Sequence, residues 1–180
     1  RYWMHVAMIN VDNRKMSKSL GNFFTVREIS DIYGYEPIRF FLINAHYRSQ
    51  INFSKKAIES SLASLKRINI ARENLERAIE SADSSGEDIL LDSAKKRLGQ
   101  FETSMDDDLN TADAIAALFD LIRDINTSEG QSKDSLSKTA EIFDTMTGVL
   151  GIKAETDGDD IPPEVIQLLE ERKKSRENKN

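Results

Sequence analysis

The sequence predicts a mainly α-helical fold, in which a small segment with one strand leads into an antiparallel bundle of helices. Apolar residues recur at steps of three, four and seven over long stretches of the chain, with charged residues between them. The 180 residues include only 3 prolines and 8 glycines, so few positions interrupt a helix. A short run rich in β-forming residues lies near the start, and it accounts for the strand.

A strand and a loop are the first expected elements. The run Val6–Val11 is apolar, so we interpret it as a buried strand. The pair Asp12–Asn13 is a turn signal that ends this strand. Residues 12–22 are then expected to form a loop.

Two short helices are expected next. Thr25 and Glu28 have the spacing of a capping box, which predicts a helix over about 26–33. Gly34 stands where a glycine commonly ends a helix. Pro37 suits the first turn of the following helix.

Four longer helices are expected to build the bundle. Ser54 is the predicted cap of the first, and the polar stretch 82–86 ends it. Asp108 or Asn110 caps the third helix, and the fourth covers about 133–150. The residues expected to face inward are Ile58, Leu62, Leu65, Ile68, Leu75 and Ile79; Ile89, Leu90, Ala94, Leu98, Phe101 and Met105; Ala114, Ile115, Leu118, Leu121, Ile122 and Ile125; and Leu136, Ala140, Phe143, Met146, Val149 and Leu150.

The expected domain organisation has four parts. Residues 1–53 form the entry segment and residues 54–151 the helical bundle. The polar, acidic residues 152–161 form a linker, and residues 162–180 begin a further helix with a thin apolar face. Because the chain starts at Arg1 rather than at a methionine, we expect an internal fragment of a longer protein.

Composition excludes several classes of protein. No run approaches the roughly 18 apolar residues that span a membrane, and the start does not resemble a signal peptide. The absence of cysteine excludes disulfides and cysteine-bound metal in this chain and fits a cytoplasmic protein. The net charge of −6 is uneven, because residues 1–56 carry nine Lys/Arg against four Asp/Glu. A basic first third suits a phosphate or RNA partner.

The segment Lys15–Ser19 is the strongest functional candidate. Two lysines three positions apart, with hydroxyl side chains between and after them, fit a mobile loop that meets phosphate. Such ammonium groups can stabilise charge that develops on a leaving pyrophosphate. The alternative on charge pattern alone is a solvated, lysine-rich turn.

The same segment carries a family resemblance. Lys15–Ser19 spells K-M-S-K-S, the second signature of class I aminoacyl-tRNA synthetases. The strings Tyr2–His5, Val11–Ile29 and Phe41–Ser54 closely resemble the cysteinyl-tRNA synthetases, and Met105–Ala112 resembles the helical domain of the same family. The resemblance therefore covers nearly the whole chain, and it implies that the entry segment is a small α/β remnant of a nucleotide-binding catalytic domain.

The resemblance implies roles for four residues of the loop. Lys18 contacts the nucleotide phosphates, and Lys15 assists through its charge and through the conformation of the loop. Both are therefore candidate catalytic and ATP-binding residues. Ser17 and Ser19 either donate to phosphate or shape the turn. ATP, with magnesium, is the implied cofactor.

Two basic sites are candidates for contact with tRNA. Arg48 lies in the polar stretch Tyr47–Gln50, which either faces the acceptor side of the tRNA or is a surface turn. Lys95, Lys96 and Arg97 lie in the segment that resembles the helical tRNA-binding domain. They either meet the RNA backbone or form a solvated face.

No metal site is expected in this chain. His5 and His46 are the only histidines, and no cysteine accompanies them. The acidic run Asp106–Asp108 invites a divalent cation, but three acids before a helix interact favourably with its positive end. The family's H-x-G-H signature and its zinc ligands, which recognise the cysteine substrate, are absent.

The sequence therefore predicts part of a monomeric cysteine–tRNA ligase whose partners are ATP, cysteine and the tRNA for cysteine. By itself this part is expected to be inactive. Two alternatives stay open. One is a non-catalytic RNA-binding or interaction module, and the other is a related class I ligase for a different amino acid or small molecule.

Overall fold

The computed structural model describes residues 3–152, and the fold is mainly α-helical as predicted. Apart from Ile152, the predicted linker and the predicted C-terminal helix lie outside the described residues. The elements are β1 (Ile9–Val11), β2 (Arg14–Lys15), a 3₁₀ turn η1 (Lys18–Leu20), α1 (Val26–Tyr33), α2 (Tyr35–Ile43), β3 (Ile51–Phe53), α3 (Lys55–Ser81), α4 (Ile89–Asp106), α5 (Thr111–Thr127) and α6 (Lys133–Leu150).

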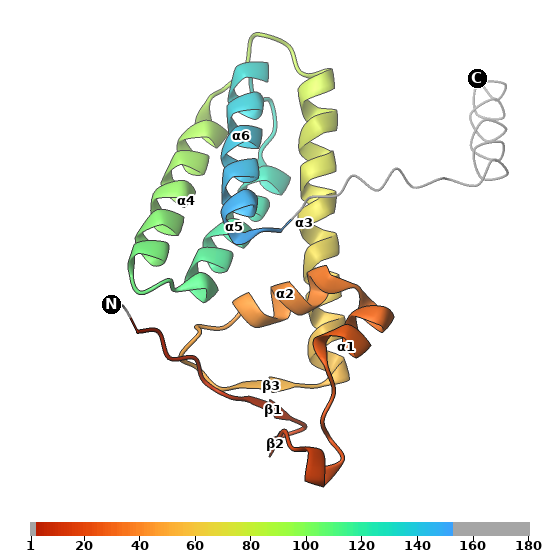
Figure 1. Cartoon of the computed structure of the whole chain (residues 1–180). Helices are drawn as coiled ribbons and strands as arrows, with labels where there is room; N and C mark the ends of the chain where they lie inside the picture. The colour runs from red at the N-terminus through yellow and green to blue at the C-terminus, as the bar shows by residue number, and fades with distance from the viewer. Residues whose placement is uncertain (1–2, 153–180) are drawn as a thin grey trace, which may run out of the picture.

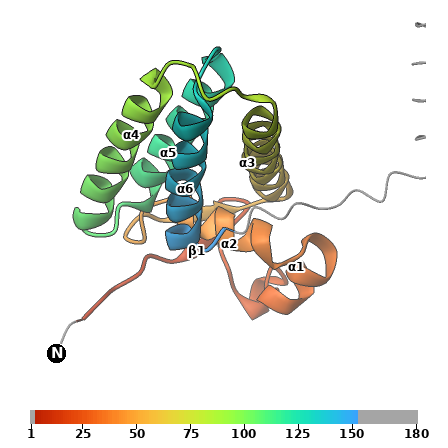
Figure 2. The ribbon, with the colours of Figure 1, turned by 90° about the horizontal axis from the view of Figure 1, so that it is seen from above.

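The long helices form a bundle that stands on the smaller entry segment. In Figure 1, α3 to α6 lie side by side, α2 crosses beneath them, and the sheet lies below α2. Seen from above in Figure 2, α4, α5 and α6 group together and α3 flanks them on one side. No helix of residues 3–152 is long and apolar enough to cross a membrane.

A three-stranded sheet replaces the single strand that was predicted. β1 lies between β2, which is antiparallel to it, and β3, which is parallel to it. The predicted strand over Val6–Val11 was too long, because Val6 and Met8 are exposed and only residues 9–11 pair. The predicted loop over 12–22 was also too simple, because it contains β2 and the turn η1.

The predicted ends of the short helices are confirmed. Thr25 accepts a hydrogen bond from the backbone N–H of Glu28, and the Glu28 carboxylate accepts from the backbone N–H of Thr25. The hydrogen bond from that backbone N–H is the main cause that lowers the pKa of Glu28. Gly34 separates α1 from α2 with φ of +79°, and Pro37 lies in the first turn of α2.

The four long helices begin at hydroxyl, amide or carboxylate residues. Ser54, Asn110 and Ser132 each accept a hydrogen bond from the backbone three residues on. Of the two caps considered for α5, Asn110 is therefore the actual one. These caps satisfy backbone donors that have no partner inside the helix.

One apolar core runs through the bundle and includes Phe40 of α2. Phe143, Leu118 and Leu121 are fully buried within it. Three residues predicted to face inward are exposed instead: Leu62 (39%), Ile89 (63%) and Val149 (56%). Ile89 is the first residue of α4 and Val149 the second-last of α6, and both face solvent although Leu90 and Leu150 beside them are buried.

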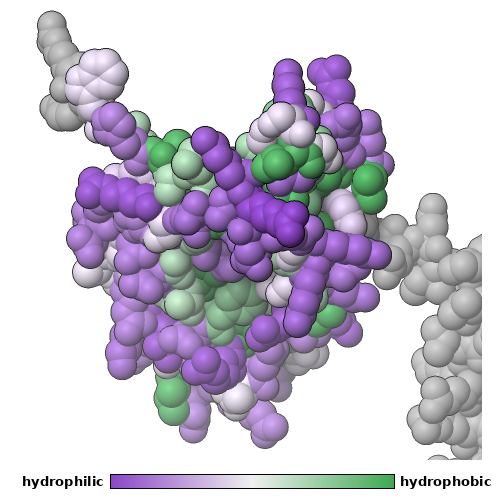
Figure 3. Space-filling model, turned by 90° about the horizontal axis from the view of Figure 1, so that it is seen from below, coloured by the Kyte–Doolittle hydropathy of each residue, from purple (hydrophilic) through white to green (hydrophobic). Residues whose placement is uncertain are grey.

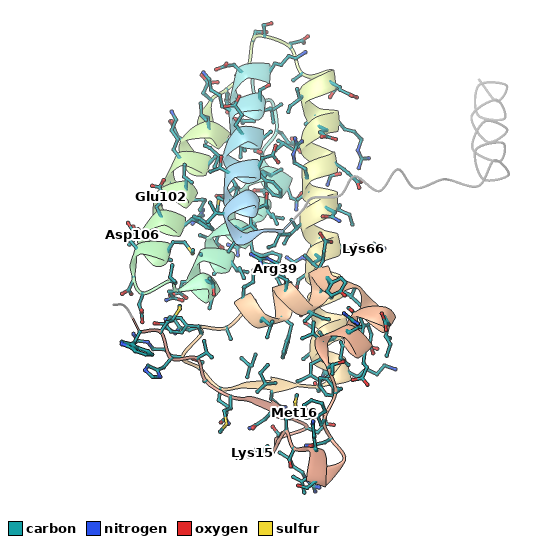
Figure 4. All side chains as sticks on the ribbon, in the orientation of Figure 1. Lys15, Met16, Arg39, Lys66, Glu102 and Asp106 are labelled. Carbon is teal, nitrogen blue, oxygen red and sulfur yellow. The ribbon has the colours of Figure 1, made fainter. Side chains whose placement is uncertain are left out.

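The entry segment and the bundle are joined by a contact between distant parts of the chain. Arg39 Nε of α2 donates to the Leu150 carbonyl at the end of α6, at 2.9 Å. Figure 4 shows Arg39 directly below that end of the helix. A cation at this position is favourable because the C-terminal carbonyls carry partial negative charge. Gly151 permits the approach, since a Cβ there would lie 2.5 Å from the Arg39 guanidinium.

We expect Gly86→Ala to destabilise the bundle by about 1–3 kcal/mol, the usual cost of overpacking. A Cβ at Gly86 would lie 2.4 Å from the backbone nitrogen of Ser132, the residue that caps the start of α6. Backbone atoms cannot rotate away as a side chain would. Urea denaturation measures the effect, and Gly99→Ala is the control because a Cβ at Gly99 meets nothing within 4 Å. Equal effects of the two substitutions would contradict the prediction.

Candidate functional site

The predicted phosphate-contacting loop lies at the end of the molecule opposite the free end of the bundle. Figure 4 shows Lys15 and Met16 at the lower end, well away from Glu102 and Asp106 on α4. Seen from below in Figure 3, the surface is mostly hydrophilic, with several separate hydrophobic patches. The loop itself is accessible, because Lys15, Lys18 and Ser19 are exposed.

The base of the loop is a tight hairpin fixed to β3. Asp12 and Asn13 form the turn between β1 and β2, with φ of 47° and 62°. Two successive positive φ values are typical of the hairpin turns that asparagine and aspartate tolerate. Asn13 N donates to Asn52 Oδ1 at 2.7 Å, and Asp12 N donates to the Phe53 carbonyl at 3.1 Å. These contacts hold the turn that leads into β2, the strand that carries Lys15, against β3.

The tip of the loop is closed by Asn22. Its Oδ1 accepts from Ser17 N at 2.9 Å, and its Nδ2 donates to the Lys15 carbonyl at 3.1 Å. Gly21, with φ of 67°, ends η1 and turns the chain back so that Asn22 reaches both groups. The sequence analysis gave Asn22 no role, although asparagine side chains in turns commonly hydrogen-bond to nearby backbone.

The side chains of the signature lie on the outside of this closed loop. Lys15 and Lys18 are exposed, and within residues 3–152 neither ammonium pairs with a carboxylate. Lys18 Nζ lies 5.2 Å from the centre of the Phe23 ring, and Ser17 Oγ lies 2.8 Å from Ser19 Oγ. The loop thus carries two exposed cations and a pair of adjacent hydroxyls, which are donors of the kind that bind phosphate oxygens.

Arg48 lies elsewhere, where the entry segment meets the α4–α5 connection. Arg48 Nε donates to the Tyr47 hydroxyl at 2.9 Å, its Nη2 lies 3.0 Å from Asp108 Oδ2, and Tyr47 donates to Asp108 Oδ1 at 2.6 Å. The hydrogen bond with Tyr47 and then the charge of Asp108 raise the pKa of Arg48. An RNA phosphate at Arg48 would therefore share this cation with Asp108.

We expected the acidic run Asp106–Asp108 to lie directly before a helix, but it lies at the end of α4 and in the turn that follows. Asp106 is the last residue of α4, Asp107 follows it, and Asp108 has φ of 55° in the connecting turn. His46 Nε2 lies 3.7 Å from Asp108 Oδ2. The helix α5 begins only after Asn110, so the role of Asp108 is to bind the turn that contains Arg48.

The basic cluster on α4 divides into one engaged and two exposed cations. Arg97 Nε donates to Asp124 Oδ2 at 2.8 Å, and Arg97 Nη1 lies 3.4 Å from Asp120 Oδ2. The hydrogen bond to Asp124 is the main cause that raises the pKa of Arg97. Arg97 thus braces α4 against α5. Lys95 and Lys96 are exposed, and Lys95 lies 3.9 Å from Asp92.

Comparison with known proteins identifies two family segments in the chain. Residues 1–63 match the class I (C) catalytic domain of tRNA synthetases, and residues 100–155 match the DALR domain. The whole chain is 41% identical to the cysteine–tRNA ligase of Lachnospira eligens over 190 residues. It is 43% identical to that of Caldicellulosiruptor saccharolyticus over 185 residues.

The chain is similar over its whole length to cysteine–tRNA ligases, as the sequence resemblance predicts. It spans 39% and 40% of the length of these two relatives. The catalytic-domain match extends into α3, ten residues past the boundary that we predicted at residue 53. That boundary therefore stays a prediction.

The fold of the chain also occurs in a solved structure. A crystal structure of a ternary complex of Agrobacterium radiobacter LeuRS, tRNA and LeuAMS matches with a TM-score of 0.62 and 20% identity. The match covers 81% of this chain and 22% of that one. At this identity the likeness shows a shared fold.

The described part of the chain does not fit the zinc site that the family resemblance implies. Within residues 3–152, no group of three or more His, Cys, Asp or Glu side chains is arranged to hold a metal ion. The chain contains no cysteine to supply thiolate ligands.

Proposed function

We propose that the chain supplies the ATP-phosphate-contacting loop and a tRNA-binding helical domain to a cysteine–tRNA ligase. The observation that carries the proposal is the closed loop of the K-M-S-K-S segment, which presents Lys15 and Lys18 without a carboxylate partner among the described residues. The family resemblance along the whole chain supports it. We place the protein in the cytoplasm as a monomer.

In the proposed first step, a carboxylate oxygen of cysteine attacks the α-phosphorus of ATP. The new oxygen–phosphorus bond gives cysteinyl-adenylate, and the bond to the bridging oxygen breaks to release pyrophosphate. Negative charge grows on the pyrophosphate as it leaves. Lys18, assisted by Lys15, stabilises that charge, while the hydroxyls of Ser17 and Ser19 donate to phosphate or keep the shape of the turn.

In the second step, a ribose hydroxyl of the tRNA attacks the adenylate carbonyl and AMP leaves. The bundle, with Lys95 and Lys96 exposed on α4, and the turn with Arg48 are the proposed contacts for the RNA. We expect Arg97 to contribute less to RNA contact than Lys95 and Lys96, because its guanidinium already pairs with two carboxylates of α5. Exposed lysines can follow a phosphate backbone without sequence preference.

A chimera tests this proposal directly. The matching 40% of the Caldicellulosiruptor saccharolyticus ligase is replaced by this chain, and cysteine-dependent ATP–pyrophosphate exchange is measured. We expect exchange by the chimera and none by the chain alone. Transfer to the tRNA for cysteine, with an unrelated tRNA as control, tests the RNA partner.

The other possible outcomes distinguish the alternatives. A folded chimera that binds tRNA but gives no exchange would favour a non-catalytic RNA-binding module. Exchange that depends on another amino acid would favour a related class I ligase, although amino-acid choice in the chimera also reflects the relative's portion. Exchange by the chain alone would contradict the expectation that other segments are needed.

A further inference from the structure

We propose that Asn22 is a positioning residue, whose side-chain amide sets the loop geometry that Lys15 and Lys18 need for catalysis. The inference rests on the proposed function for its catalytic consequence. We call the two hydrogen bonds of this side chain the clamp: Ser17 N donates to Asn22 Oδ1 at 2.9 Å, and Asn22 Nδ2 donates to the Lys15 carbonyl at 3.1 Å.

The two contacts fix the backbone on both sides of Met16. Lys15 is held through its own carbonyl, and Lys18 directly follows the residue whose N–H is held. One planar side chain therefore determines the path between the two cations. Ser17 is extended, with φ of −154°, and its own side chain makes no cap to η1. Asn22 supplies the acceptor for the Ser17 N–H.

Packing does little to hold this loop. Ser19, Leu20 and Gly21 are exposed, and Leu20 leaves 63% of its surface in solvent. Within η1 and its cap, Leu20 N donates to the Ser17 carbonyl and Gly21 N to the Lys18 carbonyl, each at 3.2 Å. These two bonds are internal to the turn, whereas the hydrogen bond from Asn22 Nδ2 to the Lys15 carbonyl connects the turn to β2.

The chemistry of the clamp requires an amide of this length. One end must accept from an N–H and the other must donate to a carbonyl, which an asparagine side chain does and a carboxylate cannot. Aspartate would keep the acceptor for Ser17 and face the Lys15 carbonyl with a second acceptor. Glutamine is longer by one methylene and would displace one of the two held segments.

Loss of the clamp is expected to reduce the rate of adenylate formation more than the binding of ATP. The lysines stabilise charge that develops in the transition state, so their spacing matters most there. A displacement of about 1 Å in a catalytic group can cost on the order of 10²-fold in rate. We expect Asn22→Ala to lower kcat by about 10- to 100-fold, with a change in KM for ATP of less than about threefold.

The first experiment uses the chain alone and does not depend on its function. Amide hydrogen exchange at Ser17, followed by NMR, is expected to speed up about 10-fold in Asn22→Ala, because the amide loses its acceptor. Asn44→Ala is the matched control, since Asn44 is exposed at the end of α2 and its side chain makes no hydrogen bond in the described part of the chain. Unchanged exchange at Ser17 in Asn22→Ala would overturn the clamp.

The second experiment uses the active chimera and separates positioning from folding. Asn22→Ala and Asn22→Asp are both expected to lose kcat with little change in KM or in melting temperature, while Asn22→Asp keeps Ser17 protected. An unchanged kcat in either variant would overturn the positioning role. A wild-type chimera without activity would overturn the proposed function and the catalytic role together, and the Ser17 exchange result would still decide on the clamp.

Discussion

Replacing Lys18 with alanine is expected to slow adenylate formation in the active chimera by about 10²–10³-fold, with a much smaller effect on the affinity for ATP. The Lys18 ammonium is exposed, has no carboxylate partner among residues 3–152, and lies over the Phe23 ring. Its charge is thus available to a leaving pyrophosphate. An interaction made mainly in the transition state lowers kcat when it is lost.

Pre-steady-state adenylate formation measures this effect. Lys138→Ala is the control, because Lys138 is an exposed lysine on α6 that pairs with Asp134 and lies outside the proposed site. A Lys18→Ala chimera that forms adenylate at the wild-type rate would remove Lys18 from the mechanism. A rise in KM alone would instead assign it to ground-state binding.

The second large effect concerns stability. Phe143→Ala is expected to lower the free energy of unfolding by about 3–5 kcal/mol, because it deletes a fully buried aromatic ring and leaves a cavity. Phe143 lies in the core cluster that α3, α4, α5 and α6 share, so the cavity cannot close by the movement of one helix.

Urea denaturation followed by circular dichroism measures the loss. Val149→Ala on the same helix is the control, since Val149 is exposed and surface substitutions change stability by about 0.5 kcal/mol or less. A loss of about 1 kcal/mol or less for Phe143→Ala would mean that the core repacks around the missing ring.

The ends of the helices were predictable from sequence because short-range chemistry determines them. The capping box of Thr25 and Glu28 and the Ser54 cap depend on residues within one turn. The bounds of α1 and α6 agree with the predicted ranges of about 26–33 and 133–150. The inward faces were harder, because periodicity gives the centre of an apolar stripe better than its margins. Leu62 lies on such a margin.

Contacts across long stretches of chain were not predictable in this way. The Tyr47–Arg48 turn was recognised as polar, but its partner Asp108 is 60 residues away from Arg48 and was assigned to a helix start. Likewise, the charges of Arg97 and Asp124 are visible in the sequence, while their pairing depends on how α4 packs on α5. The loop signature itself was found from sequence, and the role of each of its side chains stays a prediction.

The contact between Arg39 and Leu150 has a consequence for how the chain is made. The two residues are 111 positions apart, and Phe40, beside Arg39, is buried in the core to which α6 contributes. At about 5–20 residues per second, a ribosome needs on the order of 5–20 s to add the residues between them. Throughout that interval the core that contains Phe40 lacks the residues that α6 contributes. The core is therefore complete only after the last helix of the bundle has been made.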